Sequence, residues 1–180
     1  VITFNNSKGN FRKLLDPNYK ANRKKKEHPK LLSEMHEHIS EIYSTKNSYG
    51  VETDDLVATY WKTLTDKLGH NNVIIVSLDK DYKQLPCLIY NYHYKHQKII
   101  EISSYEALYN FYEQMVIGDS ADNVNYCKGY GKAYAKKLFK DCNTHYQFTK
   151  KTYELFKTIY KQKAKLKYIQ CYNLLKLRTK

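Results

Sequence analysis

The sequence has no apolar run near the ~20 residues that a helix needs to cross a bilayer, and its start shows no apolar core of a secretory signal. Its four cysteines, Cys87, Cys127, Cys142 and Cys171, are widely scattered, without a CxxC pair. The seven histidines also lack the spacing of zinc ligands. These absences argue against a membrane protein, a secreted protein and a zinc site. They predict reduced thiols in a cytoplasmic compartment.

Acidic residues are also scarce. The 180 residues include 31 Lys and Arg against 18 Asp and Glu, which gives a net charge of +13. Such a charge attracts polyanions, with nucleic acid as the first expectation and a membrane surface or an acidic protein as alternatives. The cations concentrate in residues 8–26 and again from residue 128 onward, whereas the middle of the chain carries most of the acids. The length fits one domain, or one core with a small appendage.

Apolar periodicity predicts an α/β core over the first two-thirds of the chain, followed by an all-α region. Strands are expected at Val1–Phe4 and Val73–Val76, and twice within Leu88–Ile102, with a turn near residues 93–97. Helices are expected over Pro29–Lys46, Glu52–Leu68 and Tyr105–Val116, and almost throughout after Gly131 with a break near Asn143. Because Val73–Val76 is a continuous β-branched run, we expect it to be a buried strand of a parallel sheet.

Seven carboxylates lie in three short segments. The first segment, at a helix start, holds Glu52, Asp54 and Asp55; the second, directly after the strand Val73–Val76, holds Asp79 and Asp81; the third, at a helix end, holds Asp119 and Asp122. Each segment alone has an ordinary explanation, which is helix capping for the first and a turn for the other two. If the three segments converge, however, their like charges repel, and several carboxyls would have to stay protonated.

A divalent cation would remove that repulsion. Ligands bind at the carboxyl ends of strands in open α/β sheets, where Asp79 is expected. Oxygen ligands without His or Cys suit Mg²⁺ or Mn²⁺ rather than zinc. Two such ions, ~3.5–4 Å apart, are a recurring device for phosphodiester cleavage.

A fourth segment follows the third. Lys128-Gly129-Tyr130-Gly131-Lys132 leads into a lysine-rich stretch that ends at Lys140. A GxG turn that opens a basic helix can offer backbone N–H groups to a phosphate without reading bases. This segment therefore predicts contact with a nucleic-acid backbone.

The order of these segments resembles the motif series of the 5′-nuclease family, which includes phage 5′ exonucleases, the 5′-nuclease domain of bacterial DNA polymerase I and eukaryotic flap endonucleases. The matching stretches are GVETDD at 50–55, SLDKDYKQL at 77–85 and IGDSADNVNYCKGYGKAYAKKL at 117–138. Residues 4–12 and 17–23 are similar to the family's FDxxGxxFR and YKxxR, and residues 172–177 to its late NxLLxL helix. The resemblance covers nearly the whole chain.

This resemblance implies an α/β, PIN-like parallel-sheet core in residues 1–117 and an all-α helix–three-turn–helix DNA-binding region in residues 118–180. It places Glu52, Asp54 and Asp79 around a first Mg²⁺ or Mn²⁺ ion, and Asp81, Asp119 and Asp122 around a second, with Asp54, Asp55 and Asp79 between the two. Lys20 and Arg23 would steer and polarise the scissile phosphate. DNA contacts are implied for Arg12, Lys128, Gly129, Gly131, Lys132 and Lys136. A K⁺ ion on backbone carbonyls of the helical region is a further expectation.

The match departs from the family at three places. The family's amino-terminal strand, with its aspartate, has no counterpart here; Asn5 stands in place of the FD aspartate; and Asn125-Tyr126 replace a Pro-Gly pair. Both missing carboxylates belong to the first metal site, which is therefore depleted, whereas the other site keeps its expected acids. A separate amino-terminal piece, a degraded paralogue and a truncated gene model remain open as explanations. A free sheet edge would be a liability, which favours the separate piece.

The sequence therefore predicts a metal-dependent, structure-specific 5′ nuclease, both 5′–3′ exonuclease and flap endonuclease, in DNA replication and repair. We expect a monomer in a bacterial or phage cytoplasm that binds DNA with 5′ ends, flaps or branches and no membrane. The alternatives are a catalytically impaired paralogue that binds branched DNA, or one half of a split nuclease. A PIN-like ribonuclease is disfavoured by the GxG segment and by residues 17–23.

Overall fold

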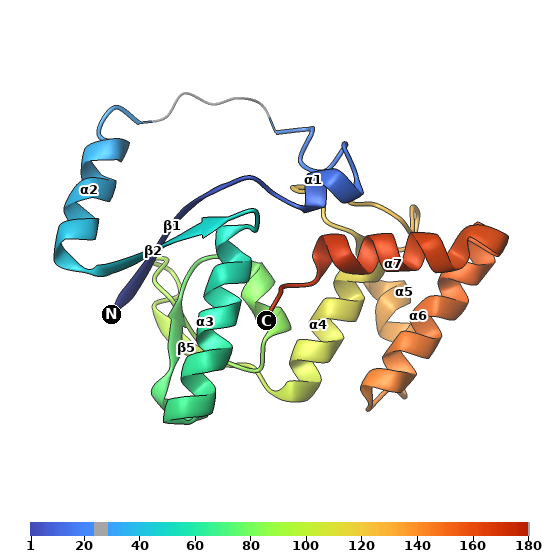
Figure 1. Cartoon of the computed structure of the whole chain (residues 1–180). Coiled ribbons are helices and arrows are strands. Elements are labelled where there is room, and N and C mark those ends of the chain that lie inside the picture. Colours follow the sequence, from blue (N-terminus) through green and yellow to red (C-terminus); the bar gives the residue numbers. More distant parts are fainter. Residues whose placement is uncertain (24–28, 180) are drawn as a thin grey trace.

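The computed structural model describes residues 1–23 and 29–179, apart from the side chains of residues 6–8. Lys24, Lys25 and Lys26, which belong to the basic run noted above, lie outside the described residues. An α/β half and a helical half lie side by side (Figure 1). The α/β half contains β1 (Ile2–Lys8), α1 (Arg12–Leu15), α2 (Leu32–Ile42), β2 (Ser44–Tyr49), α3 (Thr53–Leu68), β3 (Ile74–Val76), the 3-10 helix Lys80–Gln84, β4 (Leu88–Asn91) and β5 (Lys98–Glu101). The helical half contains α4 (Ser104–Ile117), α5 (Lys132–Leu138), α6 (His145–Tyr160) and α7 (Ala164–Leu175).

The described strands form two separate sheets. β1 pairs in parallel with β2, with Ile2 opposite Ser44. β3 pairs in parallel with β4, and β4 pairs antiparallel with β5, with Ile89 opposite Ile100. The predicted strands and their turn are therefore confirmed.

Two predictions about local structure are wrong. The helix expected over Pro29–Lys46 ends at Ile42, and β2 begins at Ser44, because pairing with β1 overrides the weak helical pattern there. The strand β3 is not buried throughout: Ile75 is 6% exposed, whereas Ile74 and Val76 are 44% and 63% exposed. Only Ile75 faces the apolar core, since successive side chains of a strand point to opposite sides.

Two apolar clusters hold the fold together. The first lies in the α/β half and includes Ala58, Trp61, Ile75, Leu85 and Ile89. The second lies in the helical half and includes Phe111, Tyr112, Phe139, Phe148 and Phe156. The helix α4 joins them, because its Ala107 belongs to the first cluster and its Met115 to the second.

Besides Ala107, a residue outside the helices of each half packs in the core of the other half. The chain turns back after α7 towards the α/β half (Figure 1), and Leu177 packs in the first cluster. Conversely, Tyr19, which follows α1, packs in the second cluster. These two contacts hold the segment that follows β1 against the helical half and the chain after α7 against the α/β half.

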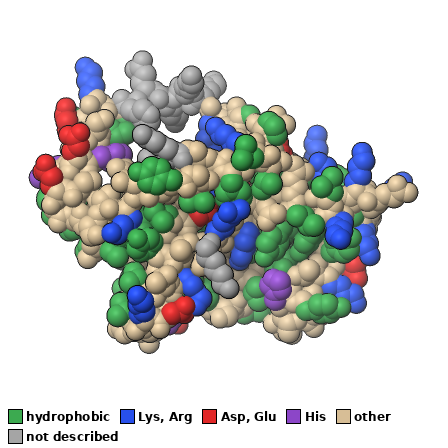
Figure 2. Space-filling view, viewed as in Figure 1, with side chains coloured by type: hydrophobic (Ala, Val, Ile, Leu, Met, Phe, Trp, Pro, Cys, Tyr) green, Lys and Arg blue, Asp and Glu red, His purple; other side chains and the backbone are tan. Residues whose placement is uncertain are grey.

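The surface reflects the uneven charge. In the space-filling view (Figure 2), Lys and Arg side chains stand along the right-hand edge, over the helical half, while acidic side chains gather at the upper left, over α2. Within the described residues, no helix combines the length and the apolar character needed to cross a bilayer.

Candidate acidic active site

The first acidic segment forms the start of α3. Glu52 is the N-cap residue and Asp55 the third helical residue, and the two form a capping box in which the Glu52 N–H donates to Asp55 Oδ2 at 3.2 Å. The capping role that the sequence suggested is therefore confirmed for these two residues. Asp54, between them, faces the other way and accepts a hydrogen bond from the Tyr82 hydroxyl at 3.1 Å.

Asp55 lies behind the site rather than in it. Its side chain is 1% exposed and accepts two hydrogen bonds from the Arg12 guanidinium, at 2.5 and 2.8 Å. The N–H of Arg178 donates a further hydrogen bond to Asp55 Oδ1 at 3.0 Å. The structure thus places the predicted bridging ligand in a buried ion pair, where both carboxylate oxygens already have partners.

Arg12 is occupied in the same way. Its side chain is 2% exposed, and its guanidinium also donates to the carbonyl oxygens of Leu174 and Lys176, at 2.8 and 2.9 Å. The sequence prediction of Arg12 as a DNA contact therefore has no support in its position. The guanidinium instead ties the segment after β1 to the end of α7, because its five N–H donors reach a carboxylate and two carbonyls at once.

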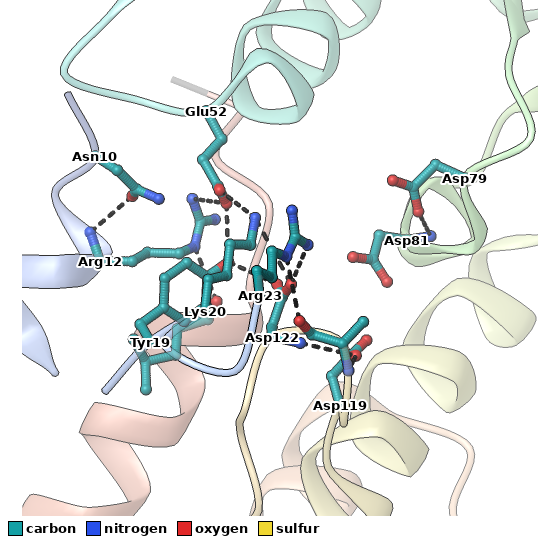
Figure 3. Close-up of polar contacts among 12 residues, drawn as sticks. Asn10, Arg12, Tyr19, Lys20, Arg23, Glu52, Asp79, Asp81, Asp119 and Asp122 are labelled. Carbon is teal, nitrogen blue, oxygen red and sulfur yellow. Dashed lines mark hydrogen bonds and ion pairs between the residues drawn. The ribbon is translucent and has the colours of Figure 1, made fainter. Parts of the chain in front are cut away.

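A cluster of two carboxylates, two cations and a phenol faces the open side of the site (Figure 3). Lys20 Nζ forms an ion pair with Glu52, and it lies 3.6 Å from Asp122 Oδ1. Arg23 Nη2 donates to Asp122 Oδ1 at 2.7 Å. The Tyr19 hydroxyl lies between the two acids, 2.9 Å from Glu52 Oε2 and 2.6 Å from Asp122 Oδ2. Burial, followed by the hydrogen bond to Asp122, raises the pKa of Tyr19 well above its usual value, so the phenol stays protonated.

The third acidic segment is a tight turn, as the sequence suggested. Asp119 and Val124 exchange backbone hydrogen bonds of 2.7 and 2.9 Å. Gly118 precedes the turn with φ +78°, and a Cβ there would meet the Val124 carbonyl oxygen at 2.3 Å, so only glycine fits. Asp119 Oδ1 caps the turn through the Ala121 N–H at 2.8 Å.

The other oxygen of Asp119 faces the second acidic segment. Asp119 Oδ2 accepts from Lys80 Nζ at 2.8 Å and from Gln114 Nε2 at 3.0 Å. Burial alone would raise the pKa of Asp119, but the Lys80 ammonium and these hydrogen bonds together lower it below its usual value. Gln114 Nε2 also donates to Asp81 Oδ1 at 2.9 Å, so this one amide links the second and third segments.

The second segment brings two further carboxylates, Asp79 and Asp81, close to the first. Asp79 caps the 3-10 helix by accepting from the Asp81 N–H at 2.9 Å. Burial, and then repulsion from Asp79, raises the pKa of Asp54 to about 6, and the same two causes raise the pKa of Asp81 to about 6. Asp54, Asp79 and Asp81 therefore interact electrostatically, although they come from two separate segments of the chain.

Four of the seven predicted metal-binding side chains line one narrow hollow. These are Glu52, Asp54, Asp81 and Asp122, and Tyr19 lies among them. Asp79 and Asp119 lie next to this group through their interactions with Asp81. In Figure 3 the side chains of Glu52, Asp79, Asp81 and Asp122 reach towards one space from different parts of the chain. The structure thus brings four of the seven side chains to one hollow and two more beside it, whereas Asp55 lies behind it in its pair with Arg12.

The donor set has the chemistry of a site for a hard divalent cation. It consists of carboxylate oxygens, and repulsion from Asp79 adds to burial in raising the pKa values of Asp54 and Asp81. Within residues 1–23 and 29–179, however, no three acidic, His or Cys side chains are close enough to hold one ion as they stand. The Lys20, Arg23 and Lys80 side chains instead supply positive charge to Glu52, Asp122 and Asp119.

The predicted backbone-binding segment lies at the surface. Lys128, Gly129, Gly131, Lys132 and Lys136 are all exposed. Gly129 has φ +91°, which favours glycine there, and open space surrounds it. A hollow of about 350 Å³ lies between this segment and the acidic site; its lining includes Lys80, Lys83, Asp81, Gln114 and Lys132. The exposed lysines and the carboxylates therefore border a common surface.

A mixed α/β domain with an acidic crevice beside the ends of its parallel strands, followed by helices, defines a resolvase-like, PIN-type fold. Residues 1–112 match the family described as the 5′–3′ exonuclease, N-terminal resolvase-like domain. The chain belongs to this family of 5′–3′ exonucleases and flap endonucleases. No curated protein matches the sequence.

Solved structures of bacteriophage T5 proteins share the fold. A T5 protein co-crystallised with metal ions is 20% identical with a TM-score of 0.70, over 99% of this chain and 76% of that one. A T5 flap endonuclease variant, in a pseudo-enzyme–product complex with DNA and metal ions, is 16% identical with a TM-score of 0.61, over 97% of this chain and 83% of that one. A T5 5′-exonuclease with bound zinc is 16% identical with a TM-score of 0.60, over 97% and 84% of the two chains.

Sequence reasoning missed four residues that shape the site. Tyr19, Tyr82 and Gln114 each donate a hydrogen bond to a predicted ligand, and Lys80 pairs with Asp119. Lys80 and Tyr82 flank Asp81 in the sequence, so their closeness to an acidic segment was a usable signal. No comparable signal existed for Gln114, because its sequence position is that of an ordinary residue in the helix α4.

Proposed function

We propose that this protein is a structure-specific 5′ nuclease that hydrolyses phosphodiester bonds in DNA, at 5′ ends and at flaps, and depends on Mg²⁺ or Mn²⁺. The observation that carries the proposal is the meeting of Glu52, Asp54, Asp81 and Asp122 in one hollow, although they come from three segments of the chain. Membership of the 5′–3′ exonuclease family supports the same reaction class.

Two groups of carboxylates would hold the metal. Asp54 and Asp79 with Glu52 form one group, and Asp81, Asp119 and Asp122 form the other, which agrees with two ions. A bound divalent ion would supply Lewis acidity and lower the pKa of bound water. Asp55 has no ligand role in this proposal, because Arg12 occupies it. A K⁺ ion in the helical region stays a prediction.

Lys20 and Arg23 would bind the scissile phosphate. Both lie at the mouth of the site, and in the absence of an ion they pair with Glu52 and Asp122. The ammonium and the guanidinium would be available to a phosphate if those two carboxylates held a divalent cation instead. Lys20 and Arg23 would thus balance the charge of the site without a metal ion and orient the substrate when an ion is bound.

The helical half would hold the DNA backbone. Lys128, Lys132 and Lys136 are exposed, and Lys132 lines the hollow that reaches Asp81, so a duplex bound there would direct one strand towards the carboxylates. Contacts of this kind fix position without reading sequence. In this proposal residues 1–117 form the nuclease core and residues 118–180 the DNA-binding region, and the four buried thiols suit a reducing compartment.

A cleavage assay tests the proposal. A 5′-flap duplex labelled at the flap is incubated with the protein in Mg²⁺, in Mn²⁺ and in EDTA, and cleavage is expected only with metal. Asp81→Asn should lower the rate by at least about 100-fold, since it removes one carboxylate and its charge. Asp66→Asn is the matched control, because Asp66 is an exposed partner of Lys62 on α3, outside the site. Cleavage in EDTA, or equal loss in both variants, would refute the nuclease assignment.

A second candidate is a DNA-binding protein that does not cleave. The specific observation in its favour is that Glu52, Asp119 and Asp122 already have protein cations as partners. This candidate predicts tight, salt-dependent binding of branched DNA, with no product at any Mg²⁺ or Mn²⁺ concentration. Binding and cleavage measured on the same flap substrate separate the two.

A further inference from the structure

Two glutamines connect the acidic site with the chain that follows α7. Gln84, the last residue of the 3-10 helix, is 4% exposed. Its Nε2 donates to the carbonyl oxygen of Leu175 at 2.9 Å, and its Oε1 accepts from the N–H of Leu177 at 3.3 Å. Leu175 ends α7, so its carbonyl has no partner within the helix. The same Nε2 of Gln84 also donates to Oε1 of Gln114 on α4, at 2.9 Å.

The backbone determines which way both amides face. An amide side chain keeps nearly the same shape after a half-turn, so its partners distinguish the oxygen from the nitrogen. Gln84 meets a carbonyl, which can only accept, and an N–H, which can only donate, so one orientation satisfies both. The nitrogen of Gln84 then faces Gln114, whose oxygen must point back towards it. The nitrogen of Gln114 is therefore directed at the acidic site.

Gln114 passes this orientation on to two acidic segments. Its Nε2 donates to Asp81 Oδ1 at 2.9 Å and to Asp119 Oδ2 at 3.0 Å, so one amide holds one oxygen of each carboxylate. The opposite orientation would turn a carbonyl oxygen towards these two groups, which only accept when they are ionised. The direction of the Gln114 amide thus determines whether it attracts or repels the carboxylates of the second and third segments.

The chain after α7 is also bound on its other side. The carbonyl oxygens of Leu174 and Lys176 accept from Arg12, and the Arg178 N–H donates to Asp55. The even-numbered residues of this stretch therefore face the first acidic segment, and the odd-numbered ones face the glutamines, as alternate residues of a strand do. Figure 1 shows the stretch between α3 and α4. One short stretch of backbone thus supports all three acidic segments.

We propose that Gln84 and Gln114 are positioning residues through which the chain after α7 sets the geometry of metal binding. The chain orients Gln84, Gln84 orients Gln114, and Gln114 holds the two carboxylates in the arrangement that a divalent ion needs. The presence of that ion rests on the proposed function. Hydrogen bonds of this kind orient the groups that bind a metal, and losing one typically lowers metal affinity by about 10–100-fold.

Mn²⁺ binding to the full chain, without DNA, tests this arrangement. The free ion gives an electron paramagnetic resonance signal that is lost on binding, so a titration yields the affinity and the number of ions. Gln114→Met keeps a side chain of similar length without its N–H groups, and it should weaken the binding of an ion at least about tenfold. Gln170→Met is the matched control, because Gln170 donates to the Leu15 carbonyl at 2.9 Å, outside the acidic site. Its affinity for Mn²⁺ should equal that of the parent protein.

A double-variant cycle separates a relay from two independent contributions. Gln84→Met leaves the Gln114 amide in place but removes the group that orients it, so Mn²⁺ affinity should fall, though by less than in Gln114→Met. If Gln84 acts through Gln114, the double variant binds Mn²⁺ no more weakly than Gln114→Met alone. Losses that simply add would overturn the relay, and so would an unchanged affinity in either single variant.

A measurement on the parent protein does not depend on the folding of any variant. The side-chain amides of glutamine, labelled with ¹⁵N, give NMR signals that a nearby Mn²⁺ ion broadens steeply with decreasing distance. A small amount of Mn²⁺ should broaden the Gln114 signal most, the Gln84 signal less and the Gln170 signal least. Equal broadening of the three signals would place the ion elsewhere and overturn the positioning role.

The outcomes also separate this role from the proposed nuclease function. If Gln114→Met weakens Mn²⁺ binding but the parent protein does not cleave a flap duplex, the positioning role stands and the nuclease function is wrong. If the parent protein and Gln114→Met bind Mn²⁺ equally and cleave at equal rates, the nuclease function stands and the positioning role is wrong. A parent protein that binds no Mn²⁺ would overturn both.

Discussion

The Arg12–Asp55 pair should be the largest single electrostatic contribution to the stability of this fold. Arg12→Met removes the guanidinium but keeps an apolar chain of similar length. Asp55, at 1% exposure, is then left with a buried charge and only the backbone N–H groups of Glu52 and Arg178. Removing one partner of a buried ion pair costs about 3–5 kcal/mol. For a chain of this size that corresponds to a melting temperature lower by about 6–20 °C.

Equilibrium urea unfolding, followed by circular dichroism and by the fluorescence of Trp61, measures this cost. The double variant Arg12→Met with Asp55→Leu removes both charges, so it should be more stable than Arg12→Met alone by about 1–3 kcal/mol. It should stay below the parent protein, since the carbonyls of Leu174 and Lys176 lose their donor. A cost under about 1 kcal/mol for Arg12→Met would refute the reasoning.

Three further predictions concern DNA binding and the site's support. Replacing Lys128, Lys132 and Lys136 together by alanine should weaken DNA binding and reduce the slope of log K against log salt by about 2.7, at ~0.9 per phosphate contact, in a fluorescence-anisotropy titration. Tyr19→Phe should lower the free energy of unfolding by about 1.5–3 kcal/mol, because two carboxylates share its hydroxyl. Gly118→Ala should cost about 1–3 kcal/mol or more, because its backbone conformation excludes a Cβ.

Each of these has a matched control. The triple alanine variant of Lys67, Lys95 and Lys98, exposed lysines of the α/β half, should leave the salt slope nearly unchanged. An equal slope change in both triple variants would show that net charge alone drives binding. Tyr146→Phe alters an exposed tyrosine and should be neutral; equal costs would contradict a special role for Tyr19. Gly131→Ala, where a Cβ meets nothing within 4 Å, should cost less than Gly118→Ala.

The sequence predicted those parts of the fold that depend on local pattern. The strand β3 and the helices α3 and α4 follow from periodicity and capping residues, since these signals act within one turn or one strand. The strand β2 was not predicted, because Ser44–Tyr49 is polar. Its extended shape depends on pairing with β1, which lies about 40 residues away in the sequence. The exposure of Ile74 and Val76 was not predicted for a similar reason, because the burial of a strand depends on the elements that pack around it.

In the candidate site, too, local sequence pattern predicted some features, whereas others depend on residues far away in the sequence. Strand-end and turn rules indicated Asp79 and Asp119, whereas the convergence of the three segments was a hypothesis that the family resemblance implied. The rules could not separate Asp54 from Asp55, because adjacent residues of a helix start carry the same signal while pointing about 100° apart around the helix. Asp55 meets Arg12 and Asp54 meets Tyr82, and both partners lie far away in the sequence.

Tyr19 and Leu177, which each pack in the core of the other half, affect how this protein can be divided or recombined. A cut near residue 103, before α4, would take Leu177 away from the core of the α/β half and Tyr19 away from the core of the helical half. The core of each fragment would then have a cavity where a side chain of the other fragment packs in the whole protein. A chimera that borrows a helical region from a relative therefore has to import a matching tail after α7 and a matching tyrosine after α1.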